Sequence, residues 1–170
     1  MLTHTGMSTD IKLATGQDTL AICAIYNHYV AKTCTTFETE PVSTDDMAAR
    51  IERAVHASLP WLIAVEQGRI AGYAYAVPWR ARSAYRRSVE LSVYLDRRDV
   101  GRGIGTRLYG TLLDSVREQG MHAVIGGVAL PNRASVALHE RFGFRKVAHF
   151  EQVGHKLGRW VDVGYWQLLL

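Results

Sequence analysis

The feature that most constrains this chain is a strand, a glycine-rich turn and a helix that follow one another directly. A strand is expected over Val89–Leu95, glycines recur at Gly101, Gly103 and Gly105, and a helix is expected over Ile104–Gln119. Glycines allow a backbone to approach a ligand closely, and a helix start presents unpaired N–H groups with the positive end of the helix dipole. The unit therefore predicts a binding site for a phosphate or pyrophosphate.

Two familiar phosphate-binding loops do not fit this turn. A P-loop requires a lysine that is absent here, and a dinucleotide fingerprint requires a third glycine where this chain has Thr106. The turn instead has the pattern R-x-x-G-x-G, formed by Arg98, Gly101 and Gly103. By itself this pattern also suits a tight turn that binds no ligand.

The order of the expected elements predicts an α/β fold. Alternating and continuous apolar runs indicate strands over Ile11–Thr15, Trp61–Glu66, Ile70–Val77, Val89–Leu95, Met121–Val128, Phe144–Phe150 and Trp160–Leu169. Helical spacing and capping residues indicate helices after Asp18, after Ser43 or Thr44, over Ile104–Gln119 and over Arg133–Phe142. The order predicts a mixed central sheet of about seven strands flanked by about four helices. We expect antiparallel strands in the first half of the chain and βαβ connections in the second half.

Three further local features are expected from the sequence. Loops are predicted over Ala31–Pro41 and from Pro78 to Arg87, and a third around Gly154–Gly158. The second helix is expected to turn four apolar residues inward, namely Met47, Ile51, Ala54 and Val55.

Length and composition indicate one ordinary globular domain. The chain has 170 residues, 48% hydrophobic and 21% charged, which suits a single domain over residues 10–170 after an extra or disordered stretch, 1–9. Met7 is an alternative start.

No secretory signal or membrane-length apolar run is found, so we expect a cytoplasmic protein without a membrane partner. Cys23 and Cys34 lack the partners of a disulfide framework or a metal site, so no metal is expected.

Positive charge is concentrated in one segment. Residues 80–107 contain eight arginines and three acidic residues, a net charge of +5, whereas the whole chain carries +4. Local basicity favours a small anionic ligand over a nucleic acid bound across a whole surface. A solvated arginine-rich face is the alternative reading.

The turn and its context resemble the GNAT acetyltransferase superfamily, whose acetyl-CoA pyrophosphate loop is written R-x-x-G-x-G. The element order matches the GNAT fold, and Asn132 begins a helix that ends in Phe142-Gly143-Phe144, as in this superfamily. The resemblance implies an acetyl-CoA site formed by Val93, Tyr94, Leu95, Arg98, Gly101, Arg102, Gly103, Ile104, Gly105, Thr106, Asn132 and Ser135.

Within the superfamily, the chain is similar to phosphinothricin N-acetyltransferases and to methionine sulfoximine/sulfone acetyltransferases. The matching clusters include Tyr26–Tyr29, Pro60–Leu62, Pro78–Arg82, Leu130–Asn132 and Gly158–Trp160. The resemblance covers about residues 10–168. It implies direct acetyl transfer to the amino group of a small amino acid or analogue, and a homodimer.

The reaction requires a base for the ammonium group, and an acid can protonate the departing thiolate. Glu90 is the candidate base, because it is a carboxylate in an otherwise apolar strand, where burial would raise its pKa. The resemblance places the catalytic glutamate of the branch here. His139 and Tyr109 are both candidate acids, and the sequence does not decide between them.

The loop after Pro78 is the candidate substrate loop. Arg80 and Arg82 offer guanidinium groups for a carboxylate or phosphinate, and the resemblance implies substrate contact by this loop, including Ser83, Ala84 and Tyr85. Phe37 is a candidate pocket wall. A surface loop of arginines and ordinary core packing of Phe37 are the alternatives.

Other functions remain open at this stage. The same chemistry would serve an N-terminal or other amine acetyltransferase, although two arginines would repel a polyamine. A non-catalytic CoA-binding module and a nucleic-acid-binding module are the alternatives from another class. Glu90 and the acid candidates argue against the first, and the confinement of charge to one segment argues against the second, so no nucleic-acid partner is expected.

Overall fold

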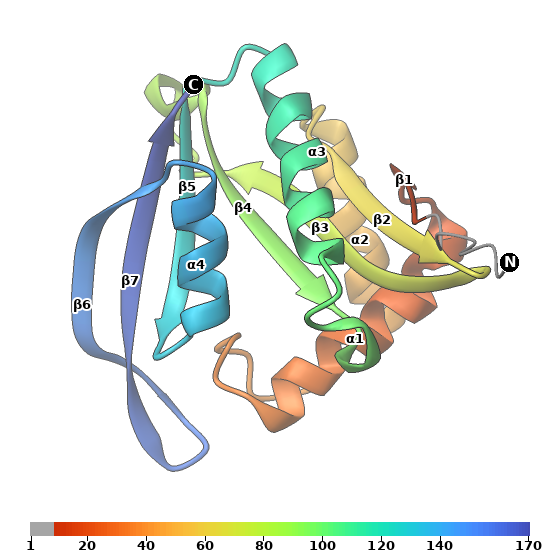
Figure 1. Cartoon of the computed structure of the whole chain (residues 1–170), viewed down its shortest axis with the longest axis horizontal. Coiled ribbons are helices and arrows are strands. Elements are labelled where there is room, and N and C mark those ends of the chain that lie inside the picture. The colour runs from red at the N-terminus through yellow and green to blue at the C-terminus, as the bar shows by residue number, and fades with distance from the viewer. Residues whose placement is uncertain (1–8) are drawn as a thin grey trace, which may run out of the picture.

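The computed structural model describes residues 9–170, which form one mixed sheet with helices on both faces (Figure 1). The strands are β1 (Asp10–Leu13), β2 (Trp61–Glu66), β3 (Arg69–Pro78), β4 (Ser88–Leu95), β5 (Ala123–Leu130), β6 (Arg145–Lys156) and β7 (Arg159–Leu169). The helices are α1 (Thr19–Lys32), α2 (Thr44–His56), α3 (Ile104–Glu118) and α4 (Arg133–Arg141). The expected seven strands and four helices are confirmed.

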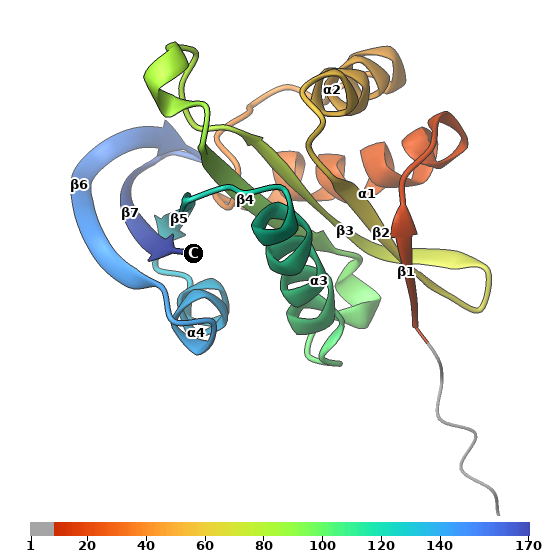
Figure 2. The same ribbon diagram turned by 90° about the horizontal axis from the view of Figure 1, so that it is seen from above.

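The sheet has the strand order β1-β2-β3-β4-β5-β7-β6. All neighbouring strands are antiparallel except β4 and β5, which are parallel. Seen from above, α1 and α2 cover one face, while α3 and α4 lie on the other (Figure 2). The parallel step follows from the connection, because α3 carries the chain back before β5 begins.

Two apolar cores lie on the two faces. One packs α3 residues such as Leu108, Leu112 and Val116 against the sheet. The other packs α1 and α2 against β2 and β3, with Ile22 and Met47 beside aromatic side chains of the strands. Alternation along β3 explains this division, since successive strand side chains point to opposite faces.

Local signals set most element boundaries. Ser43 caps α2 by accepting a hydrogen bond from the Asp46 N–H, Asn132 caps α4 in the same way, and Gly120 ends α3 at φ +74°. The expected boundaries lie within two residues of the observed ones, except at β6.

Two local expectations were wrong. The loop expected around Gly154–Gly158 is mostly strand, because β6 continues to Lys156 and only Leu157 and Gly158, both at positive φ, make the turn. A register shift between Phe150 and Gly154 interrupts the alternation that a sequence pattern detects. Val55 does not face inward but is 62% exposed, because it lies about 100° around α2 from buried Ala54.

The expected N-terminal stretch, residues 1–9, falls almost wholly outside the described residues. Thr9 is described and buried, and its hydroxyl donates a hydrogen bond of 2.6 Å to Glu66. Within residues 9–170, no helix has the length and apolarity needed to span a bilayer.

Candidate active site

Strands β4 and β5 separate soon after they begin. Their ladder joins only Ser88–Glu90 to Ala123–Ile125, after which β5 continues beside β7 and β4 continues beside β3 (Figure 1). From Leu91 to Leu95, the edge of β4 that faces β5 has no strand partner among the described residues. We call this break in the ladder the opening; it leaves backbone groups of β4 unpaired, and an extended ligand can pair with them.

Glu90 lies at the start of the opening, on the face that α1 and α2 cover. It pairs across the ladder with Val77, two residues from Tyr75, whose partner is Ser92. Its Oε1 lies above β5, where a Cβ at Gly127 would come within 3.1 Å. No described residue donates a hydrogen bond to this carboxylate. Burial raises the pKa of Glu90, and the charge of Arg80 partly offsets that rise.

Tyr109 and His139 lie on the opposite face, where α3 and α4 meet. Their rings are 5.2 Å apart and both side chains are buried. The imidazole lies directly on Gly126, where any Cβ would overlap it. The His139 Nδ1 is 2.7 Å from the Ser135 carbonyl oxygen, whereas its Nε2 and the Tyr109 hydroxyl have no partner among the described residues. Two unpaired buried polar atoms thus adjoin the opening, where a ligand can supply their partners.

The pKa values of these two groups follow from burial. Desolvation lowers the pKa of His139 and raises that of Tyr109, and the charge of Glu90 raises the pKa of Tyr109 further. His139 is therefore neutral and Tyr109 protonated at neutral pH.

The glycine-rich turn connects the open edge of β4 to α3. Gly101 and Gly103 adopt φ of +82° and +79°, the left-handed region that other residues enter at a cost. Gly103 is the N-cap of α3, so the first N–H groups of the helix point out of the turn. Ile104 anchors the helix in the core, and Gly105 and Thr106 follow in its first turn.

Two arginines of the predicted cofactor set hold the turn in shape. Arg98 pairs with Asp96 at 2.7 Å, and Arg102 pairs with Asp99 and Glu66. Asp99 is 1% exposed and also binds Arg69 at 2.7 Å. Burial of this carboxylate between two guanidinium groups fixes the conformation of the turn, and the hydrogen bonds from those groups lower the pKa of Asp99.

The remaining predicted cofactor residues are divided between the two faces. Val93 and Leu95 pack against the α3 core, whereas Tyr94 points the other way, with its ring 5.2 Å from that of Tyr26. At the start of α4, the Asn132 Oδ1 accepts a hydrogen bond of 3.1 Å from the Ser135 N–H. Asn132 therefore caps the helix, and its amide NH₂ remains as a donor.

The structure brings only part of the predicted substrate set to Glu90. The Arg80 guanidinium stacks on the Trp79 ring at 4.6 Å, and its charge lowers the pKa of Glu90. Arg82, Ser83, Ala84 and Tyr85 lie exposed in and beside a short 3₁₀ turn. Phe37 comes from the α1–α2 loop and packs on Gly154 of β6.

Comparison with known proteins identifies this arrangement. The chain matches the family model of the acetyltransferase (GNAT) domain over residues 11–164. It is 41% identical over 158 residues to a phosphinothricin N-acetyltransferase of Streptomyces viridochromogenes, an alignment that covers 93% of this chain and 86% of that protein. It is 38% identical over 160 residues to an L-methionine sulfoximine/L-methionine sulfone acetyltransferase of Salmonella typhimurium. This alignment covers 94% of this chain and 94% of that protein.

The chain belongs to the GNAT acetyltransferase family. A solved phosphinothricin acetyltransferase from Sinorhizobium meliloti, in complex with AcCoA, has the same fold with a TM-score of 0.94 at 33% identity, over 96% of this chain and 89% of that one. The family and fold that the sequence resemblance implied are thereby confirmed, as is the expectation of an acetyl-transferring enzyme.

Sequence reasoning missed several residues that shape the site of this GNAT acetyltransferase. Gly126 and Gly127 make room for His139 and Glu90 on opposite faces of β5, and Tyr165 of β7 adjoins Gly127. Two adjacent glycines inside an apolar strand were the available signal, since glycine there often marks a close approach. Asp99 left no comparable signal, because its partner Arg69 lies thirty residues away.

Proposed function

We propose that this acetyltransferase transfers the acetyl group of acetyl-CoA directly to the amino group of a small amino acid or analogue, of the phosphinothricin or methionine sulfoximine/sulfone type. The observation that carries the proposal is the opening between β4 and β5, with Glu90 on one face and Tyr109 on the other. Acetyl-CoA supplies the thioester whose C–S bond breaks as the new C–N bond forms. The similarity to enzymes named for these substrates supports this substrate class.

The described residues suit acetyl-CoA. The left-handed Gly101 and Gly103 and the start of α3 offer N–H donors to a pyrophosphate. The open edge of β4 offers backbone partners to the amides of a pantetheine arm. The unpaired atoms of Tyr109 and His139 adjoin this path, and Asn132 follows β5 at the start of α4.

Glu90 is the proposed base. The acceptor arrives mainly as an ammonium ion, which must lose a proton before its nitrogen can attack. A carboxylate with a raised pKa and no hydrogen-bond donor of its own is a stronger base than an exposed one. Its proton passes to solvent when the amide product leaves.

Tyr109 is the proposed acid, and His139 is its neighbour across a ring contact of 5.2 Å. Because Nδ1 of His139 faces the Ser135 carbonyl oxygen, the neutral ring carries its proton on Nδ1 and has only a lone pair at Nε2. A ring in this state has no proton to give to a thiolate. The Tyr109 hydroxyl retains its proton and has no partner among the described residues, so it serves as the donor to the departing sulfur, and it regains a proton from solvent when CoA leaves.

Arg80 is the proposed partner of the acceptor's anionic group, because it lies in the loop after β3 and its charge lowers the pKa of Glu90. The expected role of Arg82 rests on the resemblance alone.

We place the enzyme in the cytoplasm, supported by two buried free thiols, Cys23 and Cys34, which suit a reducing compartment.

The experiment that tests this function is free-thiol release from acetyl-CoA with a panel of amines. Phosphinothricin, methionine sulfone and plain amino acids are compared with the amide and the decarboxylated amine of one amino acid. The proposal predicts turnover with amino acids and analogues, and a loss of kcat/KM of about 10- to 150-fold in Arg80→Ala for anionic acceptors only. Equal use of all amines, equally affected by that substitution, would contradict it.

A further inference from the structure

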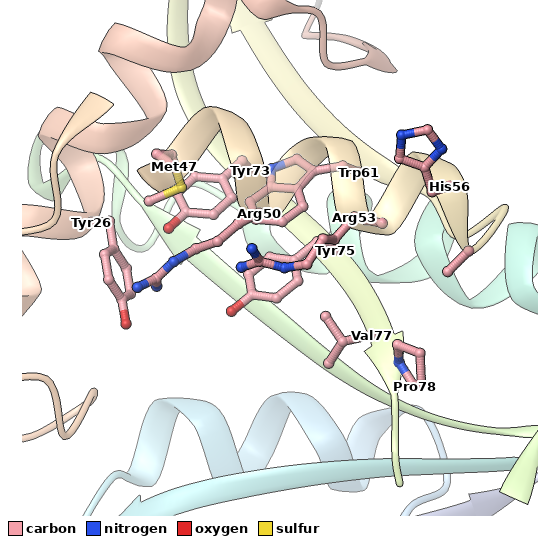
Figure 3. A pocket seen from close by; sticks show the side chains of 12 residues that line it. Tyr26, Met47, Arg50, Arg53, His56, Trp61, Tyr73, Tyr75, Val77 and Pro78 are labelled. Atoms are coloured by element: carbon pink, nitrogen blue, oxygen red, sulfur yellow. The ribbon is translucent and has the colours of Figure 1, made fainter. Parts of the chain in front are cut away.

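The pocket between α2 and the strands β2 and β3 is lined by side chains that contact one another (Figure 3). Trp61 and Tyr75 are stacked 4.2 Å apart, and the Arg50 guanidinium pairs with Glu38 at 2.7 Å. The hairpin of β6 and β7, at the far edge of the sheet, differs from it. Polar side chains on this hairpin are accessible and hydrogen-bonded to one another, and they take no part in the acetyl transfer proposed above.

Lys146, His149 and Asp162 form a chain of hydrogen bonds on this hairpin, which we call the hairpin triad. The Lys146 Nζ lies 2.9 Å from the His149 Nδ1, and the His149 Nε2 lies 2.7 Å from the Asp162 Oδ2. The Lys146 Nζ also lies 5.4 Å from the centroid of the Trp166 ring, which helps to hold the amine in place. A nucleophile within hydrogen-bond reach of a base, with the base oriented by a third group, is the arrangement of nucleophilic catalysis.

An irregularity in β6 brings Lys146 and His149 to the same face of the sheet. Side chains three residues apart in a regular strand point to opposite faces. The register shifts between Lys146 and Ala148, which leaves Val147 as an extra residue without a pairing partner on β7. Because of this bulge, the lysine amine and the imidazole lie on one face and can meet.

A second irregularity fixes Asp162. Between Phe150 and Gly154 the register shifts again, and Gln152 adopts a φ of +49°, a left-handed conformation that costs a non-glycine residue energy. The Gln152 N–H donates a hydrogen bond of 2.9 Å to the Asp162 Oδ1. This bond and the one from His149 lower the pKa of Asp162, so its carboxylate stays ionised. Backbone strain of this kind is often retained where it positions a functional group.

The pairing of His149 with Asp162 determines which imidazole nitrogen is the base. Because the carboxylate accepts a hydrogen bond from Nε2, the neutral ring carries its proton there and presents a lone pair at Nδ1. That lone pair faces the Lys146 nitrogen and can take a proton from it. The imidazolium that results is stabilised by the carboxylate.

The hairpin triad is open to molecules in solution. Lys146 is exposed, and the side chains of His149 and Asp162 are 38% and 36% exposed. The triad lies on the face of Trp166, whereas exposed Phe150 contacts Tyr165 on the opposite face. A thioester can therefore reach the Lys146 amine, and acetyl-CoA is the thioester that this family uses.

We propose that Lys146 is an acyl-acceptor site on the enzyme itself, which takes the acetyl group of acetyl-CoA with His149 as its base. One proton of the Lys146 ammonium passes to solvent, and the amine nitrogen attacks the thioester carbonyl carbon. As the C–N bond forms and the C–S bond breaks, a second proton passes from the nitrogen to His149 and on to the CoA thiolate. The products are acetyl-lysine and free CoA. This step uses neither Glu90 nor the opening, so it goes beyond the proposed function.

The first experiment uses the other lysines of the chain as internal controls. The chain has four lysines, of which Lys12 and Lys32 are exposed and Lys156 is buried. The parent enzyme is incubated with acetyl-CoA and no amine, and acetylation of each lysine is followed by peptide mass spectrometry. Lys146 is expected to react at least about tenfold faster than Lys12 and Lys32. Equal rates at the three exposed lysines would overturn the proposal.

The second experiment removes the base and includes a matched control. His149→Gln retains a polar side chain that cannot take up a proton, and His155→Gln makes the same change at an exposed position of the same strand, beside Trp160. The rate at Lys146 should fall to that of Lys12 and Lys32 in His149→Gln, and change less than about twofold in His155→Gln. A rate that His149→Gln leaves unchanged would remove His149 as the base and overturn the triad.

The third experiment separates this reaction from acetylation by the active site of another molecule. Glu90→Gln should lose turnover of the amine substrate and retain acetylation of Lys146, whereas His149→Gln should show the reverse. Loss of Lys146 acetylation in Glu90→Gln would assign the reaction to the active site and overturn the proposal. Thiol release with an amine acceptor tests the proposed function separately, so a failure of the hairpin triad leaves that function in place.

Discussion

At the scale of single residues, the environment of Glu90 links the chemistry to pH. Its carboxyl is partly buried, and its raised pKa means that it ionises at a higher pH than an ordinary glutamate. Only the ionised form accepts a proton. The kcat/KM is therefore expected to rise with pH through this raised pKa, on the acid side of the profile.

The substitution Glu90→Gln tests the same point, because it preserves shape and removes basicity. Turnover is expected to fall about 10²- to 10⁴-fold at neutral pH, and the acid-side limb of the profile should disappear. Titration calorimetry should give an unchanged affinity for acetyl-CoA, since Glu90 faces the acceptor side. Equal turnover of parent and variant would remove Glu90 from the mechanism.

The unpaired hydroxyl of Tyr109 makes a second prediction at this scale. Tyr109→Phe removes the donor, leaves the ring packing against Phe142 and Phe144, and should lower kcat about 10²-fold with little loss of folding stability. His139→Asn, which cannot titrate, should lower kcat less. A larger fall in the histidine variant, measured by thiol release, would assign the acid role to His139.

At the scale of elements, the glycine-rich turn offers a prediction with a matched control. Gly103 and Gly120 have φ of +79° and +74°, and a Cβ at either would meet nothing within 4 Å. Gly103→Ala and Gly120→Ala should therefore lose a similar free energy of unfolding, about 1–2 kcal/mol, through backbone strain alone. Only Gly103→Ala should weaken acetyl-CoA binding by calorimetry. Equal affinities in both variants would place the pyrophosphate elsewhere.

The hairpin of β6 and β7 holds the α1–α2 loop by a buried lysine. Lys156 is 4% exposed and donates a hydrogen bond of 2.7 Å to the Thr36 carbonyl oxygen, next to Phe37. Lys156→Met should release this loop and raise KM for the amine several-fold, with kcat reduced less. Lys156→Arg should restore part of the effect. Equal KM values for parent and Lys156→Met would show that the loop is held without Lys156.

Which elements the sequence could predict depends on how local their signals are. The strand from Val89, the glycines and the helix from Ile104 are adjacent in the chain, so their own residues determine them. The length of β6 depends on a register shift against β7, which no local pattern records. For the same reason, Glu90 was found as a lone carboxylate in an apolar strand, whereas Asp99 was missed because its partner Arg69 is distant in sequence.

At the scale of the whole molecule, charge is arranged by pairing. Several arginines around the predicted cofactor turn are bound to acidic residues, as Arg98 is to Asp96 and Arg102 to Asp99 and to Glu66, which lies outside the basic segment. The basic segment from residue 80 to 107 is thus partly neutralised within the fold itself. A small anionic ligand at the turn accounts for its composition better than a surface that binds nucleic acid, which needs unpaired cations spread over one face.

The assembly of the molecule is the remaining prediction at this scale. Five apolar side chains on β6, β7 and their turn are more than half exposed: Val147, Phe150, Val153, Leu157 and Trp160. Because β6 is an edge strand, this hairpin also presents unpaired backbone groups, and such a surface suits a partner. We expect a homodimer through this hairpin, with a light-scattering mass of twice 19.0 kDa at micromolar concentration.

Trp160→Asp should shift the mass toward the monomer, whereas Leu20→Asp, at an exposed apolar position on α1, should not. A parent enzyme with a mass of 19.0 kDa would contradict the dimer, and a dimer that Trp160→Asp leaves intact would move its interface to another face.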